Sequence, residues 1–150
     1  MKQKEQDSGA RVKLIAGILD AKKAEDIKIL DVRKMSALWD YFVVCSGLSS
    51  THVRSLFDNV YDEMAKLGHD AAHRDVGHDN KWIILDYGDI MVHIFDAESR
   101  QYYSIEKMWG EREELTAKFL KRVSKAVKHV KAKKQKAQKK RIKNAKKRKK

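Results

Sequence analysis

Apolar side chains recur at helical spacing in two long stretches of the chain. Residues 11–23 carry one apolar stripe, and residues 49–68 carry a longer one that follows the i, i+3, i+4, i+7 pattern without a break. Ser49 or Ser50 can cap the start of the second stretch, and Gly68 can end it. The sequence therefore predicts an amphipathic helix over each stretch.

Strand-like patterns occupy much of the rest of the first 95 residues. Strands are predicted at 27–32, 40–47, 81–86 and 90–95, and the polar loop 69–80 has room for a further short strand at 71–74. Residues 40–47 are apolar on both faces, which is typical of a central strand. Residues 97–109 are predicted to form a short helix or two turns. This order predicts an α/β (α+β) fold, in which a mixed β-sheet carries helices mainly on one face.

The last two strands are predicted to form a hairpin, because Gly88-Asp89 suits a two-residue turn. With that turn, Trp82 faces Phe95 and Asp86 faces Met91 across the pair. One face then carries only aliphatic side chains, those of Ile83, Leu85, Val92 and Ile94. The opposite face carries Trp82, Ile84, Asp86, Met91, His93 and Phe95.

The two faces of this hairpin suggest different roles. The aliphatic face is predicted to lie against the core. The other face is rich in aromatic residues and methionine and poor in charge, which is typical of a protein-binding surface. The alternative is that a terminal helix packs on this face.

Length and cysteine content limit the class of protein. The chain has 150 residues, enough for one domain with a substantial core. The single Cys45 excludes an intramolecular disulfide and fits a reducing compartment. The N-terminus has no apolar segment typical of a signal peptide, and no apolar run is long enough to span a bilayer. We therefore expect a cytoplasmic protein.

Charge divides the chain into two parts. Residues 1–114 hold 16 basic and all 21 acidic side chains, a formal charge of −5, whereas residues 115–150 hold 18 basic side chains and none that is acidic. Such a basic tail binds phosphate backbones without sequence preference. The alternative is a tail that only adds solubility or non-specific charge. The RNA-binding residues are predicted in its most basic stretch: Lys131, Lys133, Lys134, Lys139, Lys140 and Arg141.

The turn at residues 45–52, CSGLSSTH, joins a strand to a helix start, and a phosphate could be bound there. It also resembles the Gly-Ser turn of nucleotidyltransferase-like folds. Those enzymes need paired carboxylates on a following strand, and this sequence has no Asp-x-Asp there, so two-metal chemistry would lack ligands. We predict a capped helix with no catalytic residues, no metal and no cofactor.

Other candidate reactive groups also have simpler explanations. His69, His73 and His78 lie in one polar loop without a recognisable metal-binding motif, so a solvated loop is expected. His93 has no identifiable nucleophile or acid beside it, which favours an interface or structural role. Cys45 is predicted to be a small core residue.

Three blocks in order resemble the ribosomal silencing factor (Iojap-like) family. They are DYFVVCSGLSSTHV at 40–53, WIILDYGDIMVHIF at 82–95 and ESRQYYSIEKMW at 98–109, and together with ILDV at 29–32 the resemblance spans about residues 11–109. It implies a nucleotidyltransferase-like topology without the catalytic residues. It also implies binding to the large ribosomal subunit through ribosomal protein fourteen, which would block joining of the small subunit and lower translation when nutrients are scarce.

The resemblance also implies a partner-binding surface. Carried over by position, and together with Met91 from the hairpin face, that surface comprises Trp82, Asp86, Tyr87, Gly88, Asp89, Met91, His93, Arg100 and Tyr103. Trp82 is expected to be the apolar anchor, and Asp86 and Asp89 are expected to pair with basic residues of the partner. Ile105 and Met108 stand where the family usually has leucine, and both keep apolar volume.

These observations divide the chain into a flexible N-terminus at 1–10, a ribosomal silencing factor domain at 11–110, and a basic helical or disordered tail at 111–150. No small-molecule substrate and no membrane are expected as partners. Three alternatives remain open: assembly of the large subunit by binding at the same surface, nucleotidyltransferase-type catalysis, and RNA binding through the tail alone.

Overall fold

The computed structural model describes residues 2–109 and four isolated helical positions, 136, 138, 140 and 142. The described elements follow the order α-β-β-α-β-β-β-α-α along the chain. Their bounds are α1 Lys2–Ala21, β1 Glu25–Asp31, β2 Tyr41–Gly47, α2 Ser50–Lys66, β3 His73–Val76, β4 Trp82–Asp86, β5 Ile90–Asp96, α3 Ala97–Tyr103 and α4 Ile105–Trp109. Within these ranges, no helix is both long and apolar enough to cross a membrane.

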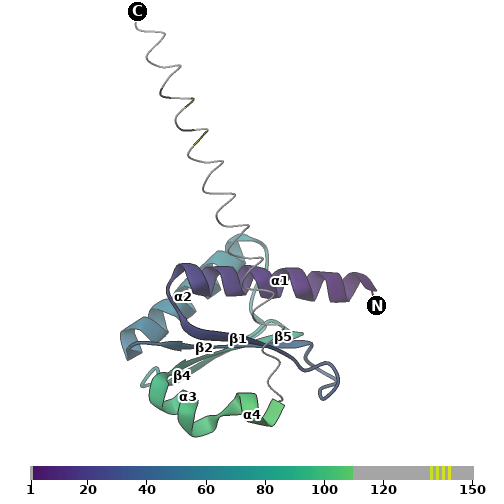
Figure 1. Ribbon diagram of the computed structural model, residues 1–150. Helices are drawn as coiled ribbons and strands as arrows, with labels where there is room; N and C mark the ends of the chain where they lie inside the picture. The colour runs from purple at the N-terminus through teal and green to yellow at the C-terminus, as the bar shows by residue number, and fades with distance from the viewer. Residues whose placement is uncertain (1, 110–135, 137, 139, 141, 143–150) are drawn as a thin grey trace, which may run out of the picture.

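The five strands form one mixed sheet in the order β1-β2-β5-β4-β3. Only β2 and β5 run parallel, and the other three neighbouring pairs are antiparallel. Figure 1 shows the long helices α1 and α2 on one face of the sheet and the short helices α3 and α4 on the other. The mixed sheet and its helices confirm the predicted α+β class. The two long helices share one face of the sheet, and the two short ones lie on the other.

Helix α1 begins earlier than the sequence pattern predicts. The structure places residues 2–10 in the helix, where a flexible N-terminal segment was expected. Val12, Ile15 and Leu19 are fully buried, and Ser8 continues their stripe one turn further toward the N-terminus. The predicted helix start at residue 11 is too late because Ser8 is polar and so interrupts the apolar pattern that marks a buried helical face.

Strand β2 is an interior strand of the sheet, and all seven of its residues are buried. Its position between β1 and β5 explains why both of its faces are apolar. The predicted hairpin register is confirmed: Trp82 pairs with Phe95 and Asp86 pairs with Met91. The polar loop contains β3 two residues later than expected, and β3 pairs with β4 at the edge of the sheet.

Helix α2 is held at both ends as predicted. The Ser49 side chain caps its start by accepting a hydrogen bond from the His52 amide at 3.1 Å. Gly68 follows the helix with φ of +82°, a conformation that glycine adopts without a Cβ clash. At the other end, a Cβ on Gly47 would lie 2.8 Å from both Cγ2 and N of Val53, so glycine lets the helix start close to the end of β2.

Two apolar cores form on the two faces of the sheet. The larger lies under α1 and α2 and includes the aliphatic face of the β4–β5 hairpin. The smaller lies under α3 and α4, where Phe42, Phe95 and Ile105 are buried and Trp39, Trp82, Met91 and Trp109 pack against them. A helical segment therefore covers part of the hairpin face that was predicted to be a binding surface, as the alternative had it.

Candidate functional site

We call the face of the sheet that carries α3 and α4 the outer face. Four outer-face residues of the hairpin are half-buried rather than covered: Trp82, Ile84, Asp86 and Met91. We call these four residues the open patch. Asp75 of β3 pairs with Ile84, so its exposed side chain lies on the same face beside the patch.

Trp82 is held in place by aromatic neighbours. Its ring stacks on Phe95 with centroids 4.9 Å apart, and Tyr103 of α3 lies 4.6 Å away on a tilted plane. The indole N–H donates a hydrogen bond to Nδ1 of His93 over 3.2 Å. One part of the Trp82 side chain is thus fixed against the sheet, while the rest faces solvent.

His93 is buried under this cluster with only 5% of its surface exposed. Burial lowers the pKa of His93 to about 4, so the ring is neutral at physiological pH. Because Nδ1 accepts from Trp82, the single ring proton belongs on Nε2. Nε2 is also buried and has no hydrogen-bond partner among the described residues. His93 therefore supports Trp82 from below and does not reach the surface of the outer face.

Asp89 lies inside the protein, where one guanidinium nitrogen of Arg11 in α1 forms an ion pair with both oxygens of its carboxylate. Nη2 of Arg11 is 2.7 Å from Oδ1 and 2.6 Å from Oδ2 of Asp89, and the Ser8 hydroxyl also donates to Oδ2. Burial alone would raise the pKa of Asp89, but the hydrogen bonds from Ser8 and Arg11 and the Arg11 charge outweigh it and lower the pKa. Asp89 is 6% exposed, so the expected pairing with a partner's basic residue does not match its position.

Tyr87 and Gly88 complete the turn between β4 and β5. Tyr87 is buried in the larger core, on the side away from the open patch, and burial raises the pKa of its hydroxyl. Gly88 has φ of +88° and is exposed, and its amide donates to Oδ1 of Asp86 over 2.7 Å. The turn thus orients the Asp86 carboxylate, while Tyr87 acts as a core residue.

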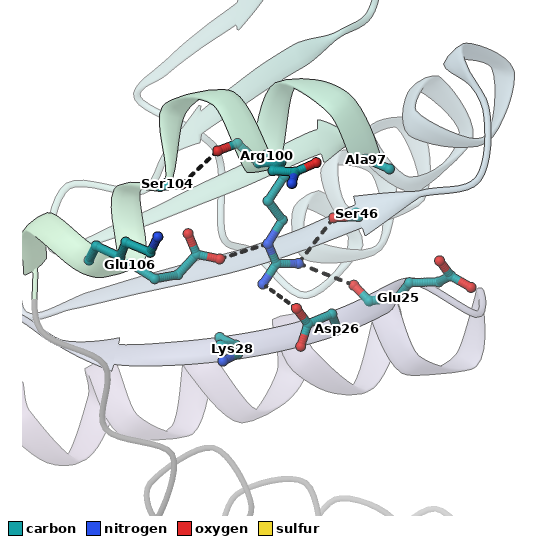
Figure 2. Close-up of a pocket in the computed structure, with 10 residues that line it drawn as sticks. Glu25, Asp26, Lys28, Ser46, Ala97, Arg100, Ser104 and Glu106 are labelled. Atoms are coloured by element: carbon teal, nitrogen blue, oxygen red, sulfur yellow. Dashed lines mark hydrogen bonds and ion pairs between the residues drawn. The ribbon is translucent and has the colours of Figure 1, made fainter.

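The Arg100 side chain lines a pocket of about 410 Å³ and links its own helix α3 to α4, β2 and β1 (Figure 2). Its Nε donates to Glu106 of α4 over 2.7 Å, and Nη1 donates to the Ser46 hydroxyl of β2 over 3.1 Å. Nη2 pairs with Asp26 of β1 at 3.2 Å. With 8% of its surface exposed, Arg100 is an internal link and not a free cation on the surface. Tyr103, by contrast, is 46% exposed beside Trp82.

The structure thus brings the predicted residues together but divides them by depth. Trp82, Asp86, Gly88, Met91 and Tyr103 reach the surface, whereas Tyr87, Asp89, His93 and Arg100 lie beneath it. Sequence reasoning missed Ser8, Arg11 and Asp75. The signal for Ser8 was its place four residues before Val12 on the buried stripe of α1.

The other candidate groups show no arrangement typical of a reaction centre. Cys45 is buried, and its burial raises the thiol pKa to about 12, as fits a core residue. His73 and His78 are exposed. Across the described part of the chain, no three His, Cys, Asp or Glu side chains are placed to hold one metal ion.

The tail residues predicted to bind RNA fall mostly outside the described residues. Lys140 is described, with an exposed helical position. Lys131, Lys133, Lys134, Lys139 and Arg141 lie outside the described residues.

Comparison with known proteins gives a consistent result. The family model described as "Ribosomal silencing factor during starvation" matches residues 5–150. The ribosomal silencing factor RsfS of Bacillus subtilis is 34% identical over 100 residues, covering 67% of this chain and 85% of that protein. RsfS of Haemophilus influenzae is 34% identical over 101 residues, covering 67% of this chain and 99% of that protein.

The fold of this chain is also similar to that of a solved structure. The crystal structure of a Chromobacterium violaceum protein superposes with a TM-score of 0.66 at 30% identity, covering 69% of this chain and 86% of that one. The likeness drawn from the three sequence blocks is confirmed by these matches. On this basis the chain belongs to the ribosomal silencing factor family.

Proposed function

We propose that this protein represses translation by binding the large ribosomal subunit and preventing the small subunit from joining it. Membership of the ribosomal silencing factor family supports a silencing role at the ribosome. The proposed partner is ribosomal protein fourteen, which by the family resemblance is expected at the face where the subunits meet. A domain bound there would occupy space that the small subunit needs.

The open patch is the observation that carries this proposal. Its centre is apolar, with Trp82, Ile84 and Met91, and its margin is acidic, with Asp86 and the neighbouring Asp75. Residues 1–114 as a whole have a formal charge of −5. An apolar centre with an acidic margin fits a basic ribosomal protein, because unlike charges speed association and select the partner.

Trp82 is proposed as the anchor of the contact. Its ring is already fixed by the hydrogen bond to His93 and by stacking on Phe95, so little side-chain freedom remains to be lost on binding. Large aromatic side chains at the centre of an interface contribute about 2 kcal/mol or more. Asp86, oriented by the Gly88 amide, is proposed to pair with a lysine or arginine of the partner.

Met91, Gly88 and Tyr103 complete the proposed contact surface. Met91 pairs with Asp86 across the hairpin, and Gly88 lies beside Asp86 in the turn. Tyr103 extends the aromatic surface from Trp82 onto α3. Tyr87, His93 and Arg100 are proposed to support these residues from below, since all three are buried.

The basic segment at residues 115–150 is proposed to contact ribosomal RNA near the docking site. Its 18 lysine and arginine residues would bind phosphates with little sequence preference. Because the domain and the tail are joined, each would raise the effective concentration of the other at its own site.

Cosedimentation with purified large subunits tests the proposal, with a subunit-joining assay on the same samples. Trp82→Ala should weaken binding by about 30-fold or more and restore joining. Tyr61→Ala is the matched control, because Tyr61 is a half-buried aromatic residue on α2, on the other side of the sheet, and it should behave like the wild type.

Two results would redirect the proposal. If Trp82→Ala binds and blocks joining as the wild type does, the open patch is not the docking surface. If the wild type binds immature large subunits at this patch but leaves joining of mature subunits unaffected, a role in subunit assembly replaces silencing.

A further inference from the structure

The hairpin turn is fixed by contacts from the first turns of α1, almost eighty residues away in sequence. Arg11 and Ser8 both donate to the Asp89 carboxylate, and Nη1 of Arg11 is 3.4 Å from the carbonyl oxygen of Tyr87. The carboxylate of Asp7 lies 3.4 Å from Nε of Arg11 and completes the pairing of that guanidinium. The turn that carries Asp86 is therefore packed against a second element rather than free in solvent.

Asp89 also joins the turn to the start of β2. Its carbonyl oxygen accepts from the Asp40 amide at 2.7 Å and from the Tyr41 amide at 3.2 Å. The Ser8 hydroxyl lies between the carboxylates of Asp89 and Asp40, 3.0 Å from the latter. A hydroxyl has one proton to donate, so Ser8 donates to only one of the two carboxylates at a time. The positive charge of Arg11 therefore balances the charge of Asp89 whichever carboxylate Ser8 bonds to.

We propose that Asp89 is a positioning residue: paired with Arg11 and Ser8, it fixes the β4–β5 turn so that Asp86 faces the ribosomal partner. This inference rests on the proposed docking through the open patch and changes the role of one residue in it. It also makes the first turns of α1 part of the binding apparatus, although α1 lies on the far side of the sheet from the patch (Figure 1).

The link from Asp89 to Asp86 is short and specific. The Gly88 amide that donates to Asp86 belongs to the residue before Asp89, so movement of Asp89 moves the donor that orients Asp86. If the turn held the competent geometry for only about a tenth of the time, the apparent affinity would fall about tenfold.

A double-mutant cycle separates positioning from direct contact. Arg11→Met and Asp89→Asn are made singly and together, and binding of the full-length chain to large subunits is measured by sedimentation. If Asp89 is positioned by Arg11, each single change lowers affinity by about tenfold, and the double variant loses no more than either one. If Asp89 touches the partner, Arg11→Met leaves affinity unchanged, the two effects add, and the proposal is overturned.

The Arg54–Asp58 pair provides the matched control. It is a half-exposed ion pair on α2 with 3.1 Å between Nε and Oδ1. Arg54→Met and Asp58→Asn, singly and together, should leave binding unchanged. If they weaken binding as much as the Arg11 and Asp89 variants, the loss reflects general loss of charge and the proposal fails.

Hydrogen exchange of the free protein adds a readout that does not depend on the ribosome. The Gly88 and Tyr87 amides should exchange at least tenfold faster in Asp89→Asn, while the β2 amides beyond Tyr41, which do not bond to the turn, keep wild-type rates. Equal acceleration throughout the sheet would mean a global loss of stability and would overturn the positioning role. If the wild type does not bind subunits at all, the proposed function fails, and the exchange data alone decide whether Asp89 fixes the turn.

Discussion

Trp82 and His93 are diagonal neighbours on the outer face of the hairpin, joined by a 3.2 Å hydrogen bond from the indole N–H to Nδ1. The bond requires an unprotonated Nδ1, and burial keeps the His93 ring neutral. The orientation of the surface tryptophan therefore depends on the charge state of a residue beneath it.

This dependence predicts acid sensitivity of the fold. The pKa of His93 is about 4 in the folded protein, against an ordinary value of 6.5. Between pH 4 and pH 6.5 the unfolded chain therefore binds more protons than the folded one. The free energy of unfolding should fall as pH drops from about 6.5 to about 4, by a total on the order of 3 kcal/mol from this group. Urea unfolding at several pH values measures the effect.

The controls for this prediction replace one histidine at a time. His93→Gln keeps an acceptor but cannot be protonated, so its stability should depend less on pH over this interval. His73→Gln makes the same exchange at an exposed histidine of β3 and controls for the substitution itself. An unchanged slope in His93→Gln would show that His93 does not cause the acid sensitivity.

Replacing Gly47 should destabilise the domain. A Cβ there would lie 2.8 Å from Cγ2 and from N of Val53, so α2 must shift away from β2. We expect Gly47→Ala to cost about 1–3 kcal/mol in thermal or urea unfolding. Gly9→Ala is the control, because a Cβ at Gly9 in α1 meets nothing within 4 Å and improves helix propensity. Gly9→Ala that destabilised as much as Gly47→Ala would contradict the steric account.

Arg100→Met should detach α4 from the sheet. The substitution leaves the largely buried Glu106 without its cation, which typically costs about 3–5 kcal/mol. Lys107→Met removes an exposed charge on the same helix and should change unfolding by less than about 0.5 kcal/mol. Similar losses in the two variants would mean that Arg100 acts only through net charge.

Removing the tail should make ribosome binding less sensitive to salt. Each RNA phosphate neutralised by a lysine or arginine adds about 0.7–0.9 to the slope of log K against log salt. A chain ending at Gly110 should therefore show a shallower slope than the full chain. Changing Lys131, Lys133 and Lys134 to Gln in the full chain should give an intermediate slope. Equal slopes for all three chains would rule out RNA contacts by the tail.

The sequence predicted the hairpin well because its signals are local. A two-residue turn at Gly88-Asp89 and strict alternation set the register, and Trp82 and Phe95 pair as expected. The same reasoning predicted a cap at Ser49 or Ser50, of which the structure shows Ser49, and the end of α2 at Gly68, where single residues carry the information.

Depth below the surface was harder to predict, because it depends on partners distant in sequence. Asp89 was expected to face a partner, but Arg11 and Ser8 enclose it from α1. Arg100 was expected to contact the partner, but it pairs with Asp26, which lies in the irregular stretch of β1 between Glu25 and Lys28. A charged residue in a turn looks the same in sequence whether its counter-ion belongs to another protein or to its own chain.

The sheet order has a consequence for synthesis of the protein. Of the strands that the structure describes, β5 is the last to leave the ribosome, yet it lies between β2 and β4. Until residues 90–96 emerge, β2 can pair only with β1, and its other edge stays unpaired. An unpaired edge of an uncharged strand promotes aggregation. The sheet of the nascent chain therefore cannot be completed before β5 has emerged. Fragments that end before Ile90 should be insoluble, and the surface proposed to silence ribosomes exists only once the whole domain has been made.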